Sequence, residues 1–248
     1  LRVDSQAVVK FTPEGGIEVR GGITTNQAVF TSFKDDEYGG STDGGMSGDP
    51  VWQGIRLFTQ RPVMFQDTTI RSASTGVWME NSAPVFSKVF IQNCAEAALS
   101  VDMASSPRFD EILLEGNRIN GMVVRTPALP DGETRWERLG TGKQVVRVFL
   151  ETLTIGPASQ LSILDGVVLK FGPQVSLVVE GQLSVTGNEL SPVIFTALSD
   201  DSAGGDSDLS TAPPNRGTWR GLYVNPNNTV ARLSLVSMEI RYAENGLF

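Results

Sequence analysis

The chain has 248 residues, of which 40% are hydrophobic and 19% are charged, so the composition excludes a disordered polar segment and allows a sizeable core. The formal net charge of −8 argues against nucleic acid as a partner, because the phosphate backbone is bound by clustered Lys and Arg. No apolar run approaches the ~20 residues of a membrane span, so no membrane insertion is expected.

Short strands separated by turn residues are expected from the first residues onward, beginning with Leu1 to Val3. The 26 glycines and 13 prolines supply the turns, and no long stretch carries the 3.6-residue period of an amphipathic helix. The composition therefore predicts an all-β fold.

Three segments in the middle of the chain begin with proline and are spaced by 22 and 23 residues, at Pro62, Pro84 and Pro107. Each carries an aliphatic residue at a matching position, and these are Ile70, Ile91 and Leu114. The regular spacing predicts that these three side chains stack on one another and point inward. The polar stretch from Pro127 to Lys143, which contains Trp136, is predicted to be a connecting loop or an irregular coil.

The last third of the chain repeats the first. Lys10-Phe11 recurs as Lys170-Phe171, 160 residues later, and Trp52 recurs as Trp219, 167 residues later. Four such matches keep the same order, with offsets that drift from 160 to 170. We therefore divide the chain into units 1–160 and 161–248, the second truncated. The pattern predicts one continuous β-helix over 1–248, as a fragment of a longer array.

A coil of short strands cannot bury its own apolar face, whereas stacked coils enclose one continuous core. A β-sandwich is the alternative, but it gives no reason for equivalent residues to recur every 15 to 23 positions. The predicted fold is therefore a single-stranded parallel β-helix, a solenoid with a tandem-duplicated unit.

The succession LTI, GVVLKFGP, LVVEGQLSV, PVIFTA and MEIRYAENG resembles bacterial right-handed parallel β-helix repeat proteins, which have a pectate-lyase-like architecture. The resemblance covers nearly the whole chain. It implies a right-handed solenoid and an extracellular or cell-surface location in a bacterium. It says much less about activity, because this architecture serves lyases, hydrolases and adhesins alike.

An acidic, glycine-rich loop occurs twice, each time after a strand that ends in Phe-Thr. Carboxylates on such turns supply the hard oxygen ligands that Ca²⁺ prefers, so Ca²⁺ is the expected cofactor. The candidate ligands are Asp200, Asp201, Asp206 and Asp208 in the second copy, and Asp35, Asp36 and Asp43 in the first. The alternative is a solvated turn, where Asp and Gly are favoured without a metal.

Catalysis is the less favoured interpretation of the same residues. Polygalacturonase-like β-helix hydrolases accompany an aspartate pair with a Gly-His-Gly motif, which a chain without histidine cannot have. A lyase base could be Arg71 or Arg241, but their equivalent positions favour a repeated, outward-facing strand arginine. Trp52 and Trp219 are interpreted as packing residues, with sugar stacking as the alternative.

Three smaller features are interpreted as structural. Cys94 is expected to be a small buried hydrophobic residue. Asn93 and Asn117 are candidates for a stacked ladder of turn amides. The Asn227-Asn228-Thr229 sequon is too short a motif to support glycosylation.

The expected function is a non-catalytic extracellular structural or adhesive module of a larger surface or secreted protein, stabilised by Ca²⁺. The alternatives are a polysaccharide lyase or glycoside hydrolase, a carbohydrate-binding β-helix, and a self-assembling filament subunit. The expected partners are neighbouring repeat units, or copies of the chain stacked end to end, and a surface polysaccharide is a further candidate.

Overall fold

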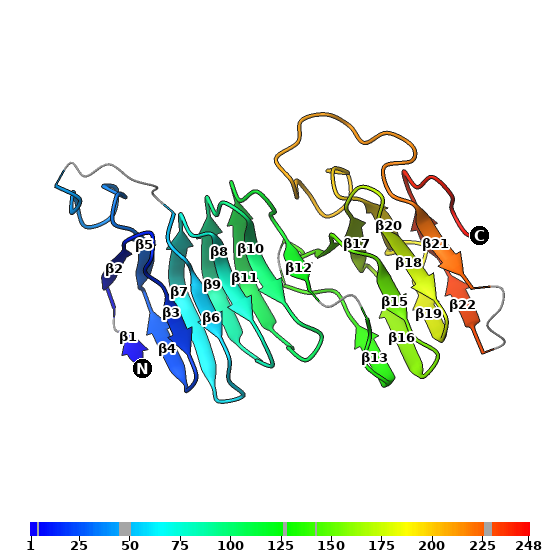
Figure 1. Cartoon of the computed structure of the whole chain (residues 1–248), viewed down its shortest axis with the longest axis horizontal. Coiled ribbons are helices and arrows are strands. Elements are labelled where there is room, and N and C mark those ends of the chain that lie inside the picture. The colour runs from blue at the N-terminus through cyan, green and yellow to red at the C-terminus, as the bar shows by residue number, and fades with distance from the viewer. Residues whose placement is uncertain (4, 45–50, 126–127, 142, 226–229) are drawn as a thin grey trace. The chain divides into compact units, whose positions relative to one another are not determined.

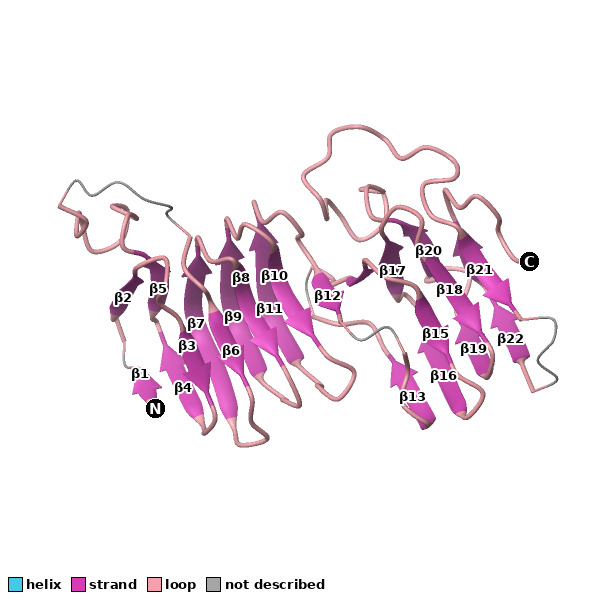
Figure 2. Ribbon diagram, viewed as in Figure 1, coloured by secondary structure: helices cyan, strands magenta, loops and turns pink. Residues whose placement is uncertain are grey.

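The computed structural model describes residues 1–3, 5–44, 51–125, 128–141, 143–225 and 230–248. In this part of the chain the regular elements are β-strands and there is no helix (Figure 2), which confirms the predicted all-β class. It follows that no helix among the described residues is long and apolar enough to cross a membrane. The strands form about eight turns of a parallel β-solenoid.

The chain divides into two compact units. The first comprises Leu1–Met122 with Gly140–Lys143, and the second comprises Val123–Leu139 with Gln144–Phe248. This division follows contacts in space, whereas units 1–160 and 161–248 follow the sequence repeat, so the boundaries differ. Strand β12 (Met122–Val124) lies where the first unit passes into the second.

The first unit consists of two parallel sheets (Figure 1). One sheet contains β1 (Arg2–Val3), β2 (Val8–Phe11), β4 (Ile23–Asn26), β5 (Val29–Ser32), β7 (Val63–Arg71), β9 (Val85–Gln92) and β11 (Arg108–Glu115). The other row contains β3 (Ile17–Val19), β6 (Ile55–Leu57), β8 (Thr75–Met79) and β10 (Ala97–Val101). The strands β7, β9 and β11 begin directly after Pro62, Pro84 and Pro107, as the proline spacing predicted.

Equivalent side chains stack along the core of this unit. Ile70 lies in register with Ile91, which lies in register with Leu114. Ile70 and Ile91 are fully buried, so the predicted stack is confirmed, and Leu114 is half-buried. An aromatic row runs beside it, with ring centroids 5.2 Å apart in both the Phe65–Phe86 and the Phe86–Phe109 pair. Such repeated rows are the packing that a solenoid core requires.

The second unit has three parallel rows of strands. The first contains β14 (Arg147–Phe149), β17 (Val168–Phe171), β20 (Val193–Ala197) and β23 (Met238–Ile240). The second contains β13 (Gly132–Trp136), β16 (Ser159–Leu164), β19 (Gln182–Thr186) and β22 (Arg232–Val236). The third contains β15 (Leu153–Ile155), β18 (Ser176–Val179) and β21 (Gly221–Val224). Its core also carries stacked rings, such as Phe149 on Phe171 with centroids 5.4 Å apart.

The sequence repeat corresponds to a structural repeat. In the β2–β5 pair, Lys10 lies opposite Thr31, and in the β17–β20 pair, Lys170 lies opposite Thr196. The same lysine–threonine pair therefore introduces the acidic loop in both copies.

One prediction about the middle of the chain was wrong in part. The stretch from Pro127 to Lys143 is not a plain loop, because it contains β13, which pairs with β16 over five residues. The Trp136 side chain is buried there, and the Arg147 guanidinium lies over its ring at 5.1 Å. β13 is short, and the residues before Trp136 are glycine or polar, so the sequence lacks the apolar–polar alternation that would predict a strand.

Asn117 links neighbouring coils through the backbone rather than through a ladder with the Asn93 amide. Asn117 is fully buried, donates from Nδ2 to the Ile91 carbonyl at 2.8 Å, and accepts the Cys94 N–H at 2.9 Å. It therefore links two successive coils. The Asn227-Asn228-Thr229 sequon lies outside the described residues.

Candidate functional site

The two acidic loops begin with the same aspartate turn. The Thr31 hydroxyl donates to Asp35 Oδ2 at 2.5 Å, and the Thr196 hydroxyl donates to Asp200 Oδ2 at 2.6 Å. The second oxygen of each carboxylate accepts a backbone N–H two residues later, as in an Asx-turn. The Asp200 residue is only 1% exposed, so its carboxylate faces the solenoid rather than the open side of the loop.

In each copy, a lysine from the preceding coil donates a hydrogen bond to a glycine carbonyl of the loop. Lys170 Nζ donates to the Gly205 carbonyl at 2.6 Å, and Lys10 Nζ donates to the Gly40 carbonyl. Lys170 is fully buried. Burial lowers the pKa of its ammonium to about 8, although Asp201 and the other three loop aspartates attract the charge.

An arginine from the following coil closes the network. Arg71 Nε lies 3.1 Å from Asp35 Oδ2 as an ion pair outside hydrogen-bond geometry, and its Nη1 lies 2.6 Å from Glu37. Arg241 Nη1 lies 3.8 Å from Asp200 Oδ2. Burial alone would lower the pKa of Arg71, but hydrogen bonding to Glu37 and the charge of Asp35 outweigh it, so that pKa is raised. Arg71 ends β7 and Arg241 directly follows β23, so the interpretation of a repeated, outward-facing arginine holds, and each of the two also pairs with the loop aspartate.

The two tryptophans secure the chain where it returns from each loop. Trp52 stacks on Phe11 with ring centroids 4.3 Å apart, and Trp219 stacks on Phe171 at 4.4 Å. Each Nε1 donates at 2.8 Å to an arginine carbonyl, that of Arg71 in the first copy. Both tryptophans are fully buried, so the packing interpretation is confirmed and neither ring face is open to a sugar.

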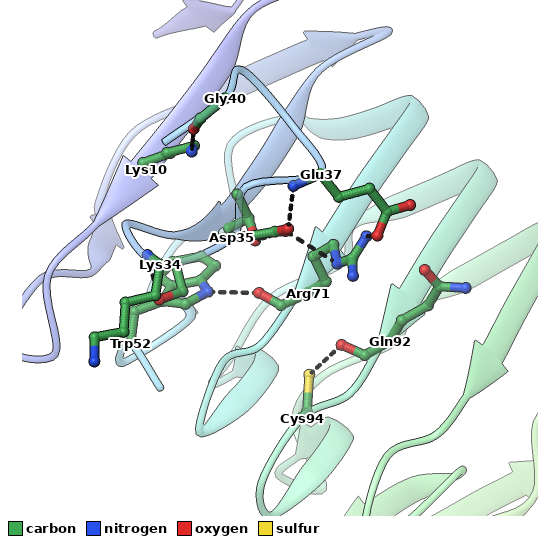
Figure 3. A network of polar contacts seen from close by, with 11 residues as sticks. Lys10, Lys34, Asp35, Glu37, Gly40, Trp52, Arg71, Gln92 and Cys94 are labelled. Atoms are coloured by element: carbon green, nitrogen blue, oxygen red, sulfur yellow. Dashed lines mark hydrogen bonds and ion pairs between the residues drawn. The ribbon is translucent and has the colours of Figure 1, made fainter. Parts of the chain in front are cut away.

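We call this repeated set of contacts the loop latch. It comprises Lys10, Thr31, Asp35, Trp52 and Arg71 in the first copy, and Lys170, Thr196, Asp200, Trp219 and Arg241 in the second. Figure 3 shows part of the first copy, in which the Arg71 guanidinium contacts the Asp35 carboxylate and the Arg71 backbone carbonyl accepts a hydrogen bond from the indole of Trp52. Sequence reasoning found the aspartates and tryptophans but missed the lysines as partners, because only coil stacking brings them to the loop.

Three of the predicted calcium ligands come together in the second loop. One carboxylate oxygen from each of Asp201, Asp206 and Asp208 lies within 4.8 Å of the others. Burial and the charge of Asp206 raise the pKa of Asp201, although Lys170 opposes the shift. Asp200 is not part of this group, because its oxygens are bound to Thr196 and Ser202.

The first loop does not gather its predicted ligands. Asp35 is bound in the latch, Asp36 is exposed, and Asp43 accepts a hydrogen bond from the Ser41 hydroxyl at 3.2 Å. Among the described residues, these three aspartates form no cluster of the kind seen in the second loop. The two copies thus share the latch and differ in the acidic cluster.

No protein-family model, no curated protein and no solved structure matches the chain. The parallel β-solenoid is established by the strand pairing itself. The narrower resemblance to bacterial pectate-lyase-like proteins remains an expectation.

The arrangement constrains what chemistry the loops can perform. A general base needs a lone pair that can reach a substrate, and the latch uses the Asp35 and Asp200 oxygens for hydroxyl, backbone and guanidinium partners. Both arginine guanidinium groups are likewise engaged with carboxylates, and the Arg241 side chain remains partly exposed. The latch residues therefore hold the loop to the coil, and the three clustered carboxylates of the second loop lie close enough together that they could hold a metal ion.

Proposed function

We propose that this chain is a non-catalytic structural β-solenoid module of a larger secreted or surface protein, in which each repeat carries one latched loop. The observation that supports this most strongly is that ten latch residues, five from each copy, pair with equivalent partners in the two copies of the loop, although the arginine–aspartate contact is longer in the second. The polar side-chain atoms of these ten residues hold each loop to the neighbouring coils. Further coils, from a longer chain or from another copy, are the partners that fit this role.

Calcium is part of the proposal for the second loop alone. Asp201, Asp206 and Asp208 would supply the carboxylate oxygens, and backbone carbonyls of the glycine turn would supply others. A bound cation would relieve the repulsion that raises the pKa of Asp201. The positive charge of Lys170 provides part of the same relief, and its hydrogen bond to the Gly205 carbonyl holds the loop, so calcium adds to a loop that is already held.

Replacement of the latch aspartate tests the structural role. We expect Asp200→Asn to lower the free energy of unfolding by about 1–3 kcal/mol, because a buried, hydrogen-bonded acceptor loses its charge. Asp36→Asn is the matched control, since that side chain is exposed, and we expect a change within about 0.5 kcal/mol. Equal effects of the two substitutions on the thermal midpoint would contradict the proposal.

Activity measurements test the non-catalytic part. The intact chain should release no reducing ends and no unsaturated products from polygalacturonate, with or without calcium. Turnover that is lost in both Arg71→Gln and Arg241→Gln, while both variants remain folded, would show instead that the latch arginines are catalytic.

A further inference from the structure

A hollow lies on the outer face of the first unit, away from the latch. Its volume is about 400 Å³, within the range of small-molecule sites. It is lined by Asp67, Lys88, Glu111 and Lys143, with Phe90 and Leu113 as the apolar part. The charged residues include two acids and two lysines, so the pocket offers both signs of charge beside an apolar surface.

The backbone conformation at three of these positions directs their charged side chains outward. Asp67, Lys88 and Glu111 have φ values of 44°, 53° and 52°, so each forms a left-handed bend within its strand. The strand register places the three bends on successive coils, about 4.8 Å apart. The bend interrupts the alternation of inward and outward side chains, so that Ser87 and Lys88 both lie on the outside. The alternation then resumes, with Val89 buried and Phe90 exposed.

The bend itself does not require charged residues. The equivalent bend is made by Gln27 between β4 and β5, and by Ser237 between β22 and β23, with φ values of 50° and 46°. A negative–positive–negative row at Asp67, Lys88 and Glu111 is therefore an additional feature of these three coils.

These charges do not neutralise one another by direct contact. In the part of the chain that the structure describes, no hydrogen bond or ion pair joins the charged groups of Asp67, Lys88, Glu111 and Lys143. Thr141 Oγ1 donates to Asp110 Oδ1 at 3.0 Å, which places the segment carrying Lys143 beside β11. Phe90 is 43% exposed, so a ligand could cover its ring.

We propose that this pocket binds a small zwitterion with an apolar side chain, of the chemical class of an aromatic α-amino acid. The ligand carboxylate pairs with Lys88 and Lys143, its ammonium pairs with Asp67 or Glu111, and its ring packs on Phe90 and Leu113. Both charges of such a ligand find a partner, and its apolar group finds the exposed ring. A neutral sugar carries no negative charge that could pair with the two lysines.

Titration of isotope-labelled protein with four probes tests the proposal, followed by the backbone amide signals of residues 88–90. The probes are L-phenylalanine, L-phenylalaninamide, 3-phenylpropionate and D-galacturonate. We expect L-phenylalanine to bind most tightly, and the two analogues that lack one charge to bind at least about tenfold more weakly.

Two variants separate the charges. Lys88→Gln should weaken the binding of L-phenylalanine and 3-phenylpropionate about tenfold and leave that of phenylalaninamide unchanged. Because either acid can pair with the ammonium, the double substitution Asp67→Asn with Glu111→Gln should weaken the binding of L-phenylalanine and phenylalaninamide about tenfold and leave that of 3-phenylpropionate unchanged. Arg56→Gln is the control, because Arg56 is exposed on β6 in the other row of strands. Absence of signal changes up to about 10 mM phenylalanine, equal losses for every probe, or tighter binding of galacturonate would each overturn the proposal.

Discussion

At the residue scale, the buried Lys170 ammonium makes the stability of the fold depend on pH. Its pKa falls from 10.5 to about 8 on folding, so the unfolded chain holds the proton more strongly than the folded chain between these values. Stability should therefore rise as pH increases through this window. From about pH 7.5 to about pH 9.5 we expect a gain of about 2 kcal/mol from this group.

Comparison with Lys170→Met isolates that contribution, because the variant keeps the other titrating groups. The unfolding free energy of the wild type should rise by about 2 kcal/mol relative to that of Lys170→Met between about pH 7.5 and about pH 9.5. A constant difference across this range would mean that Lys170 is already neutral, or is fully solvated, in the folded chain.

Cys94 offers a second test at the same scale. The residue is 2% exposed, and burial raises the pKa of its thiol to about 12. Because the thiolate is the reactive form, native protein should react with iodoacetamide far more slowly than urea-unfolded protein at about pH 8. Equal rates would show that the coil around Cys94 opens readily. The prediction that this cysteine is a buried hydrophobic residue is confirmed by its position.

At the element scale, close contact between coils makes certain glycines necessary. A Cβ atom at Gly54 would lie 1.8 Å from the Thr75 carbonyl oxygen, and one at the equivalent Gly221 would lie 1.8 Å from that of Asn245. Both residues also have positive φ. Gly54→Ala and Gly221→Ala should each destabilise the fold by several kcal/mol, on the order of the largest single-residue effects.

Gly21→Ala is the control for both substitutions, because no atom lies within 4 Å of its added Cβ and its φ is not in the left-handed region. Thermal unfolding followed by circular dichroism should show a large decrease in midpoint for the first two variants and little change for the control. A tolerated Gly54→Ala would contradict the close stacking of β6 on β8.

A further prediction at this scale concerns the effect of calcium on the acidic loops. Millimolar calcium should raise the thermal midpoint relative to EDTA, because an ion that binds only the folded state stabilises it by mass action. Asp206→Asn should abolish most of that shift, since Asp206 is one of the three clustered carboxylates. Asp43→Asn, in the copy without such a cluster, should leave the shift intact. The same midpoint in calcium and EDTA would remove calcium from the proposal.

At the scale of the whole molecule, the repeat was readable from sequence because stacking requires similar residues at similar positions. The Pro62, Pro84 and Pro107 spacing gave the strand starts of three coils, and the Ile70–Ile91 stack followed from it. The β13 strand was missed because its residues are mostly polar and because two strands, β14 and β15, separate it from its partner β16.

The site was harder to predict than the fold. The aspartates and tryptophans are visible in the sequence as repeated motifs, but the direction of a side chain is not. Asp200 resembles its neighbours in sequence, yet it faces Thr196 and Arg241 while Asp201 faces the open loop. Lys170 lies 35 residues before Gly205, and only the stacking of β17 on β20 brings the two together.

Hydrogen–deuterium exchange tests the central claim, that both acidic loops are held to the solenoid by the same latch. We expect amides of residues 200–205 to exchange slowly in the wild type and to lose protection in Arg241→Gln and Asp200→Asn, while amides of the first loop keep theirs. Arg71→Gln should produce the mirror result, with protection lost over residues 35–40 alone. Fast exchange of both loops in the wild type, or unchanged protection in these variants, would contradict the latch.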